Sequence, residues 1–468
     1  MFLIRPRLPL KKFKNIDAWV AITIPQVCFI LLYTYKLLNG SSFNAHFIGN
    51  SDVMQSLEGF VLEDDFFGAI KGMHTQPPLL NVIFGLAILV SKFHHILVIQ
   101  ILWLLVAQLG LLFLTLGLRL ITNNSILAVL FSSLYVFIPG TLMYSLWSYN
   151  TIWVQTFSIM FIVSFLHLKK GTSQVLNFLC VLVSLVVLYL VRVPFNFIFV
   201  TAFIILSWIH LDKKLQQIRV VRAATFAAIS VILGLQAHYY VNFGLLTTSS
   251  WTLDQSLNVL KKGLDSKEKS EIAQVNSCFY SVINNGPWKT IDSYSTCEVQ
   301  EERIAQSSFF EISRRANPLN SKEHLLGSTA IKDILIYSIP RYLPAYWKVI
   351  FGHEQFEGTL YNYLGLKNFS RTFLNVAIYS FIPIYFLFSL ILFVCVLALN
   401  RKRSLRALQV IVVPLILTLF MNAYSLVGEV VENERIRADS HAVTFFTATL
   451  IYVLFLKFWR QIRNISKF

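Results

Sequence analysis

Residues 77–93 read PPLLNVIFGLAILVSKF, and the topology of the whole chain depends on whether this run crosses a membrane. The run is apolar and almost long enough to span the ~30 Å hydrocarbon core of a bilayer. The chain around it has 468 residues, of which 56% are hydrophobic and only 14% are charged. A soluble domain has about 45–50% apolar residues, so the composition predicts an all-α polytopic membrane protein.

Ten other apolar runs are long enough to be predicted as transmembrane helices. These runs are 18–38, 96–118, 125–145, 151–168, 174–191, 194–210, 220–242, 372–398, 406–427 and 441–459. The first follows a basic segment without a small-residue cleavage site, so we expect a retained span and not a signal peptide.

The distribution of charge decides how residues 77–93 are placed. If they cross, the basic loops 169–170, 213–222 and 401–406 fall outside, against the positive-inside rule. If they lie in the interface as a juxtamembrane helix, 20 Lys and Arg and two acids fall on the cytoplasmic side, giving +18. The other side then carries 20 basic and 22 acidic residues, giving −2, and the two sides sum to the observed +16. The net charge therefore predicts topology and not nucleic-acid binding.

This topology predicts three parts of the chain. Residues 1–243 form a transmembrane core with a first outer loop at 39–95, residues 244–371 form an extracytoplasmic insertion, and residues 372–468 form the C-terminal transmembrane helices. Within the insertion we expect helices over 262–275 and 298–316 and an aromatic interfacial run at 331–351. Cys278 and Cys297 are the only cysteines there. We expect a disulfide between them in an oxidising compartment, with two free thiols as the alternative.

The first outer loop carries acidic residues that could take part in chemistry. Asp52 could accept a proton from an attacking hydroxyl. It could equally be the N-cap of a helix over 53–62. Asp64 and Asp65, beside Glu63, could bind a divalent metal, or they could simply be solvated between two helices.

Other polar residues on the outer side could bind a phosphate or a sugar. Pro77 and Pro78 predict a helix start, which places His74 and Gln76 at its mouth. There they could contact a phosphate or sugar or coordinate a metal, although a lone histidine is more often structural. Arg192 stands at the outer end of a span, where it needs a partner or must snorkel, and a lipid phosphate suits its guanidinium. A second charged cluster precedes the last span; it consists of Glu434, Arg435 and Arg437, and could clamp a phosphate or form a solvated hairpin.

These residues together resemble the GT-C glycosyltransferases, membrane enzymes that use a polyprenyl-phosphate sugar donor, and within them the protein O-mannosyltransferase and lipid A aminoarabinose transferase group. The resemblance rests on Asp52, followed by His74 and the Pro-Pro-Leu helix start. A second family site, often an Asp at the start of a span, matches Tyr149 and Asn150. Asparagine is a poorer base and metal ligand, so this departure puts metal dependence in doubt.

The resemblance implies a GT-C-like fold with about ten transmembrane helices and inverting sugar transfer from a polyprenyl-phosphate to an extracytoplasmic glycan, lipid or protein acceptor. Asp52 would be the general base, and Arg192, Arg435 and Arg437 would hold the phosphate. The remaining expected contacts to substrate are His74, Gln76, Tyr149, Asn150 and Glu434. A transporter or lipid flippase and a non-catalytic relative that binds lipid-linked sugar are the alternatives. We expect a bacterial cytoplasmic membrane in preference to the endoplasmic reticulum, contacts with membrane lipid, and no nucleic-acid partner.

Overall fold

The computed structural model describes residues 18–50, 56–246, 248–250, 257, 260–261, 263–275, 305–342, 385–392, 394, 410–421 and 439–465. Over these residues the regular structure is helical, and the only β pairing is an isolated bridge between Asn44 and Trp147. The prediction of an all-α chain is confirmed for this part of the protein.

Five described helices are long and apolar enough to cross a membrane. They are α1 (Ala18–Leu38), α5 (His95–Thr122), α8 (Thr151–Lys170), α9 (Gln174–Val191) and α12 (Arg219–Phe243). Shorter apolar helices include α4 (Leu79–Val90), α6 (Ser125–Val136), α10 (Phe197–His210) and the first part of α23 (His441–Ile465). The chain is therefore an α-helical membrane protein, with five spans rather than ten meeting the length criterion among the described residues.

The predicted span 125–145 is not one helix. Helix α6 ends at Val136, and a second helix, α7 (Pro139–Ser145), begins at the proline. Proline has no N–H to donate and its ring clashes with the carbonyl four residues earlier, so it starts α7 instead of continuing α6. The hydroxyl of Thr141 donates to the carbonyl of Tyr135 at 3.1 Å, which helps to satisfy the interrupted backbone.

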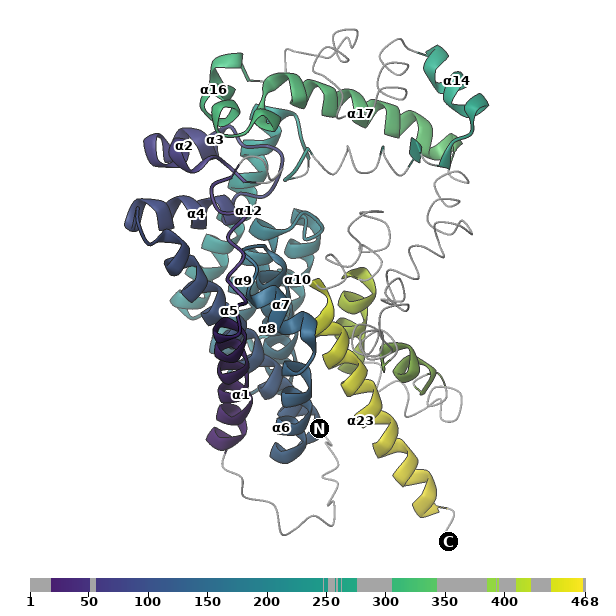
Figure 1. Ribbon diagram of the computed structural model, residues 1–468. Coiled ribbons are helices and arrows are strands. Elements are labelled where there is room, and N and C mark those ends of the chain that lie inside the picture. The colour runs from purple at the N-terminus through teal and green to yellow at the C-terminus, as the bar shows by residue number, and fades with distance from the viewer. Residues whose placement is uncertain are drawn as a thin grey trace.

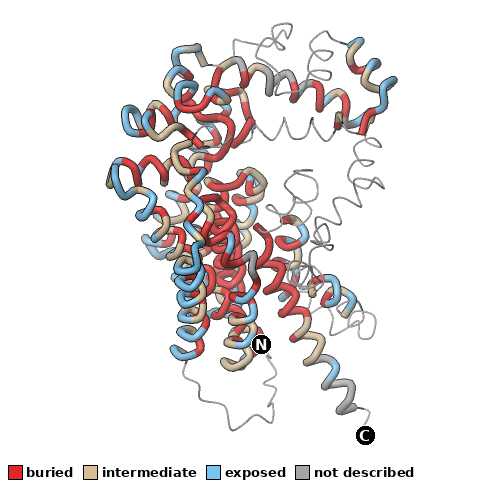
Figure 2. The backbone as a smooth tube through the Cα atoms, viewed as in Figure 1, coloured by how far each residue is buried: buried red, intermediate tan, exposed pale blue. Residues whose placement is uncertain are grey.

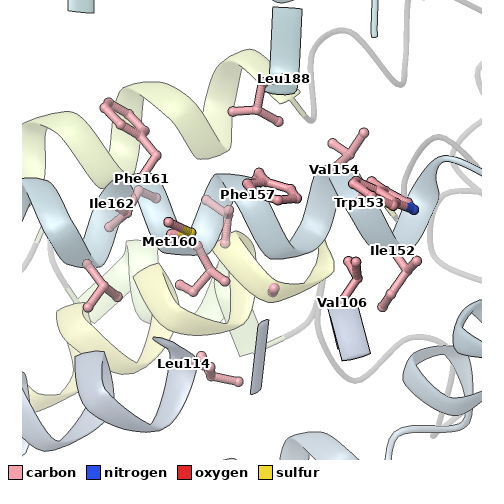
Figure 3. Packing of buried hydrophobic residues seen from close by; sticks show 14 of the residues in the cluster. Val106, Leu114, Ile152, Trp153, Val154, Phe157, Met160, Phe161, Ile162 and Leu188 are labelled. Atoms are coloured by element: carbon pink, nitrogen blue, oxygen red, sulfur yellow. The ribbon is translucent and has the colours of Figure 1, made fainter. Parts of the chain in front are cut away.

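Helix α8 forms the centre of the bundle. Of its most apolar 18-residue window, 94% is buried inside the protein, compared with 28% for α5 and 22% for α12. Figure 2 shows this contrast between a buried interior and exposed outer helices such as α1. Figure 3 shows part of the packing, with Trp153, Phe157 and Phe161 on α8 among aliphatic neighbours.

Helices α5 and α8 run side by side in the same direction. Gly110 lies against Thr156, and Gly117, two turns later, lies against Val163, two turns later on α8. The hydroxyl of Thr156 also donates to the carbonyl of Val106 at 2.9 Å. A side chain at either glycine would meet α8 at less than 3.0 Å, so glycine permits the close approach.

The ends of these helices define two ends of the bundle. We call the end where α5 and α8 finish the basic end, because Arg119, Lys169 and Lys170 lie there. Lys457 of α23 donates to the carbonyl of Ile121 at this end. The turn before α12 joins them, since the amide of Asp212 donates to Gln174 at the start of α9.

The opposite end, where α8 begins and α9 finishes, we call the distal end. Helices α2 (Gly59–Asp64), α3 (Phe66–Lys71), α16 (Ser307–Ala316) and α17 (Lys322–Arg341) lie beyond it, away from the start of α1 (Figure 1). The remaining described helix of this region is α14 (Ser266–Val275). The two helices that the sequence predicts over 262–275 and 298–316 are therefore present as α14 and α16, although their bounds differ.

Helix α4 begins directly after Pro78, as the double proline predicts. Its 12 residues extend about 18 Å at 1.5 Å per residue, well short of the hydrocarbon thickness. The chain before it packs beside the distal end of α12, and α5 after it starts from the distal end. Both ends of α4 therefore lie near the distal end of the bundle.

The prediction of a helix over 53–62 is wrong for residues 56–58. These residues are not helical, and α2 begins only at Gly59. Two long-range bonds hold this stretch instead. The amide of Leu57 donates to the side chain of Asn81 at 3.0 Å, and that of Glu58 donates to the carbonyl of Ala316 at 2.8 Å. Tertiary contacts thus replace the local helical pairing.

Candidate functional site

A buried ion pair lies at the distal end between α9 and α23. Nε of Arg192 is 3.1 Å from Oδ2 of Asp439, and the two side chains are only 9% and 6% exposed. Removing both charges from water is costly unless they face each other, so the pair fixes the guanidinium in position. We call Arg192, Asp439, Asn150 and Tyr149 the arginine cluster.

Local sequence explains how both charged residues reach this position. Arg192 adopts an extended backbone with φ −144° and ψ 129°, which ends α9. Proline at 194 also prevents the helix from continuing. Asp439 stands just before α23, where a carboxylate is favoured by the positive end of the helix dipole.

Two predicted residues at the start of α8 join this cluster. The side-chain Nδ2 of Asn150 donates to the carbonyl of Val191 at 3.3 Å, directly beside Arg192. The carbonyl of Tyr149 accepts from Trp103 at 3.0 Å, and its ring packs on Phe47 at 4.7 Å. The structure thus brings together Tyr149, Asn150 and Arg192, which are predicted separately from the sequence.

Sequence reasoning missed Asp439. The available signal was an acidic residue two positions before the apolar run 441–459. Residues 428–440 contain five other charged residues, so the charge pattern alone does not single out Asp439.

His74 lies in different surroundings. It is fully buried, its Nδ1 is 2.9 Å from the hydroxyl of Ser250, and its Nε2 is 3.1 Å from the carbonyl of Ser321. Its ring also stacks on that of His324 at 6.0 Å. Burial, and secondarily the charge of His324, lowers the pKa of His74 to about 3, so the ring is neutral at physiological pH.

The backbone around His74 is bonded just as fully. The side-chain oxygen of Asn320 accepts from the amides of His74 and Thr75 and from the hydroxyl of Thr75, at 3.0–3.2 Å. The amide of Ser250 donates to the carbonyl of His74 at 2.8 Å. We call these residues, with Ser321, the histidine clasp, because they join the segment between α3 and α4 to the segment 305–342.

Gln76 follows the histidine clasp and is buried. Its carbonyl accepts from the hydroxyl of Tyr239 at 2.9 Å, which ties the loop to α12. Its side-chain Nε2 has no hydrogen-bond partner among the described residues. Gln76 therefore has a donor available to a ligand, whereas both ring nitrogens of His74 already have partners.

Asp64 and Asp65 are exposed and lie between α2 and α3, as the sequence predicts for solvated acids between two helices. Oδ1 of Asp65 accepts from the amide of Gly68 at 2.8 Å and so caps α3. Within the described ranges, no three His, Cys, Asp or Glu side chains gather as they would around a metal ion. The local geometry therefore gives Asp65 a structural role.

Several predicted residues lie outside the described residues. They are Asp52, Glu434, Arg435, Arg437, Cys278 and Cys297.

Comparisons with protein-family models, with curated proteins and with solved structures found no match for this chain. Functional reasoning therefore depends on the chain's own residues.

Proposed function

We propose that the protein is a membrane glycosyltransferase that moves a sugar from a polyprenyl-phosphate donor to an extracytoplasmic acceptor, with inversion at the sugar. The observation that carries the proposal is the buried pair of Arg192 and Asp439 beside Asn150. A guanidinium held at the end of an apolar bundle suits the phosphate of a lipid whose tail remains in the bilayer. The GT-C-like fold with about ten spans belongs to the same proposal.

In the proposed reaction the acceptor hydroxyl attacks the anomeric carbon of the sugar. Asp52 takes the hydroxyl proton as general base. The bond from the sugar to the phosphate oxygen breaks, and its electron pair stays on the phosphate. Arg192, with Arg435 and Arg437, stabilises the charge that develops there.

The proposed orientation places the basic end in the cytoplasm and the distal end outside. It is supported by the collection of Arg119, Lys169, Lys170 and Lys457 at one end. We propose the bacterial cytoplasmic membrane as the location.

The proposal is tested with purified protein in lipid nanodiscs. A panel of radiolabelled decaprenyl-phosphate sugars and a cell-envelope extract serve as donors and acceptors. We expect transfer of label from at least one donor, and an Asp52→Asn loss of about 10²–10⁴-fold, the usual contribution of a general base. Asp265→Asn, an exposed acid on the outer segment, is the matched control and keeps full transfer. Absence of transfer from every donor, or full transfer by Asp52→Asn, would contradict the proposal.

A transporter or flippase is the second candidate, and one feature favours it. The apolar run 125–145 is interrupted between α6 and α7, where the hydroxyl of Thr141 donates to the carbonyl of Tyr135. Interrupted helices of this kind line substrate sites in transporters. Flux of lipid-linked sugar across proteoliposomes without sugar transfer would identify this function instead.

A further inference from the structure

Three residues within one turn, at the N-cap and start of α8, carry buried polar atoms with no hydrogen-bond partner among the described residues. They are Oδ1 of Asn150, Oγ1 of Thr151 and Nε1 of Trp153. The residues are only 4%, 1% and 8% exposed. A buried polar atom without a partner is destabilising, so a ligand that satisfies all three would be bound favourably.

Two of these atoms have a defined direction. The amide of Asn150 uses Nδ2 to donate to the carbonyl of Val191, so Oδ1 faces the other side of the amide group. The ring of Trp153 is held by Trp103 and Phe157, with ring centres 5.5 and 5.8 Å away. In Figure 3 its indole nitrogen points away from the labelled hydrophobic side chains, toward the end of α8 that carries Asn150.

The chemistry of the three atoms distinguishes a hydroxyl from a phosphate. Asn150 offers an acceptor, Trp153 offers a donor, and the hydroxyl of Thr151 can do both. An ionised phosphate oxygen only accepts, so it would leave the Asn150 oxygen unsatisfied and repel it. A sugar hydroxyl donates and accepts at once, and therefore matches this set.

We infer that Asn150, Thr151 and Trp153 bind hydroxyl groups of the donor's sugar, while Arg192 binds its phosphate; the inference rests on the proposed function. The two parts of such a donor are directly bonded. The two parts of the site are also adjacent, because the side chain of Asn150 donates to the carbonyl of Val191, which precedes Arg192. The start of α8 then determines which sugar is accepted.

The test measures binding of two probes to wild-type and variant protein in nanodiscs: decaprenyl phosphate, and decaprenyl phosphate carrying the hexose that the transfer assay identifies. Thr151→Val removes its polar group with little change of shape, Asn150→Leu also removes the bond to Val191, and Trp153→Phe removes the indole N–H together with one ring. Ser158→Ala is the matched control, because it removes a buried hydroxyl two turns further along α8. Thermal stability and gel-filtration profiles identify variants that fail to fold.

We expect Thr151→Val and Trp153→Phe to weaken binding of the sugar-bearing lipid about tenfold each, the equivalent of one good hydrogen bond. Binding of decaprenyl phosphate should stay within about twofold of wild type, and Ser158→Ala should change neither. Equal weakening of both probes, or no weakening of either by the folded variants, would overturn the inference alone. A wild-type protein that binds neither probe would overturn both the proposed function and this inference.

Discussion

The arginine cluster and the histidine clasp are both buried polar regions at the distal end, but they differ in how well their polar atoms are satisfied. In the clasp both ring nitrogens of His74 and the oxygen of Asn320 have partners within hydrogen-bond distance, and only Nδ2 of Asn320 has none among the described residues. Asn150 in the arginine cluster and Thr151 next to it retain polar atoms with no partner among the described residues. A fully bonded buried group contributes to the fold, whereas an incompletely bonded one is available to a ligand.

The comparison changes the role assigned to His74. Its position just before the start of α4 allows contact with a phosphate or sugar when the sequence is considered alone. Its burial and its two bonds, to Ser250 and Ser321, instead favour a structural role in joining two segments. The following variants test whether the arginine cluster binds substrate while the histidine clasp stabilises the fold.

The largest effect is expected from Arg192→Met. It leaves the buried Asp439 carboxylate without the cation beside it, which should cost about 3–5 kcal/mol of stability. The double variant Arg192→Met/Asp439→Leu should recover most of this loss but not binding of decaprenyl phosphate. Thermal unfolding in detergent and lipid binding measure the two effects. Recovery of lipid binding in the double variant would show that Arg192 does not hold the phosphate.

A smaller loss of folding stability is expected from Asn320→Leu. Three donors from His74 and Thr75 lose their acceptor, so we expect about 3 kcal/mol, at roughly 1 kcal/mol per bond. Asn320→Asp keeps the acceptor and should lose less. Transfer activity of the folded fraction should be unchanged in both variants. Loss of transfer with unchanged thermal stability would place the clasp in the active site.

The next largest effect is expected in the pH dependence of stability. The folded protein lowers the pKa of His74 to about 3, below the ordinary 6.5, so its contribution is complete above pH 6.5 and is lost as the pH falls. Between pH 7.5 and 5.5 we expect a loss of about 1 kcal/mol, measured as a fall in melting temperature. His74→Gln has no titrating ring and should show a shallower decline. An equally steep decline in that variant would assign the effect to other groups.

The smallest effect is expected at α3. Asp65→Ala removes the N-cap and should cost about 0.5–1 kcal/mol. Asp65→Ser retains a capping oxygen and serves as the control. Transfer with and without chelator should be the same in both variants and in wild type. A loss of activity that added Mg²⁺ restores would favour the metal site that the sequence left open.

The sequence predicted the long helices well because their apolar runs and breakers are local. Helices α1 and α9 have the predicted bounds, and Pro78 marks the start of α4. The run 125–145 is apolar throughout and long enough for one span, so its length favours a single helix although Pro139 divides it into two. Residues 56–58 were misassigned because their partners, Asn81 and Ala316, are distant in sequence.

The same reason limits what could be predicted of the site. Tyr149, Asn150 and Arg192 could be proposed because each is a polar residue at the end of an apolar run. Their grouping with Asp439 could not, since 247 positions separate the arginine from its carboxylate. The partnership of His74 with Asn320 spans a similar distance.

The burial of α8 has a consequence for biosynthesis. One of its covering helices, α23, is translated about 270 residues after α8 ends. At roughly 5–20 residues per second this delay is about 15–55 seconds. Throughout that interval a helix containing Gln155, Ser158 and Ser164 must reside in the bilayer without its last neighbour. The nascent chain therefore needs a temporary companion for α8, either lipid, the insertion machinery or a membrane chaperone.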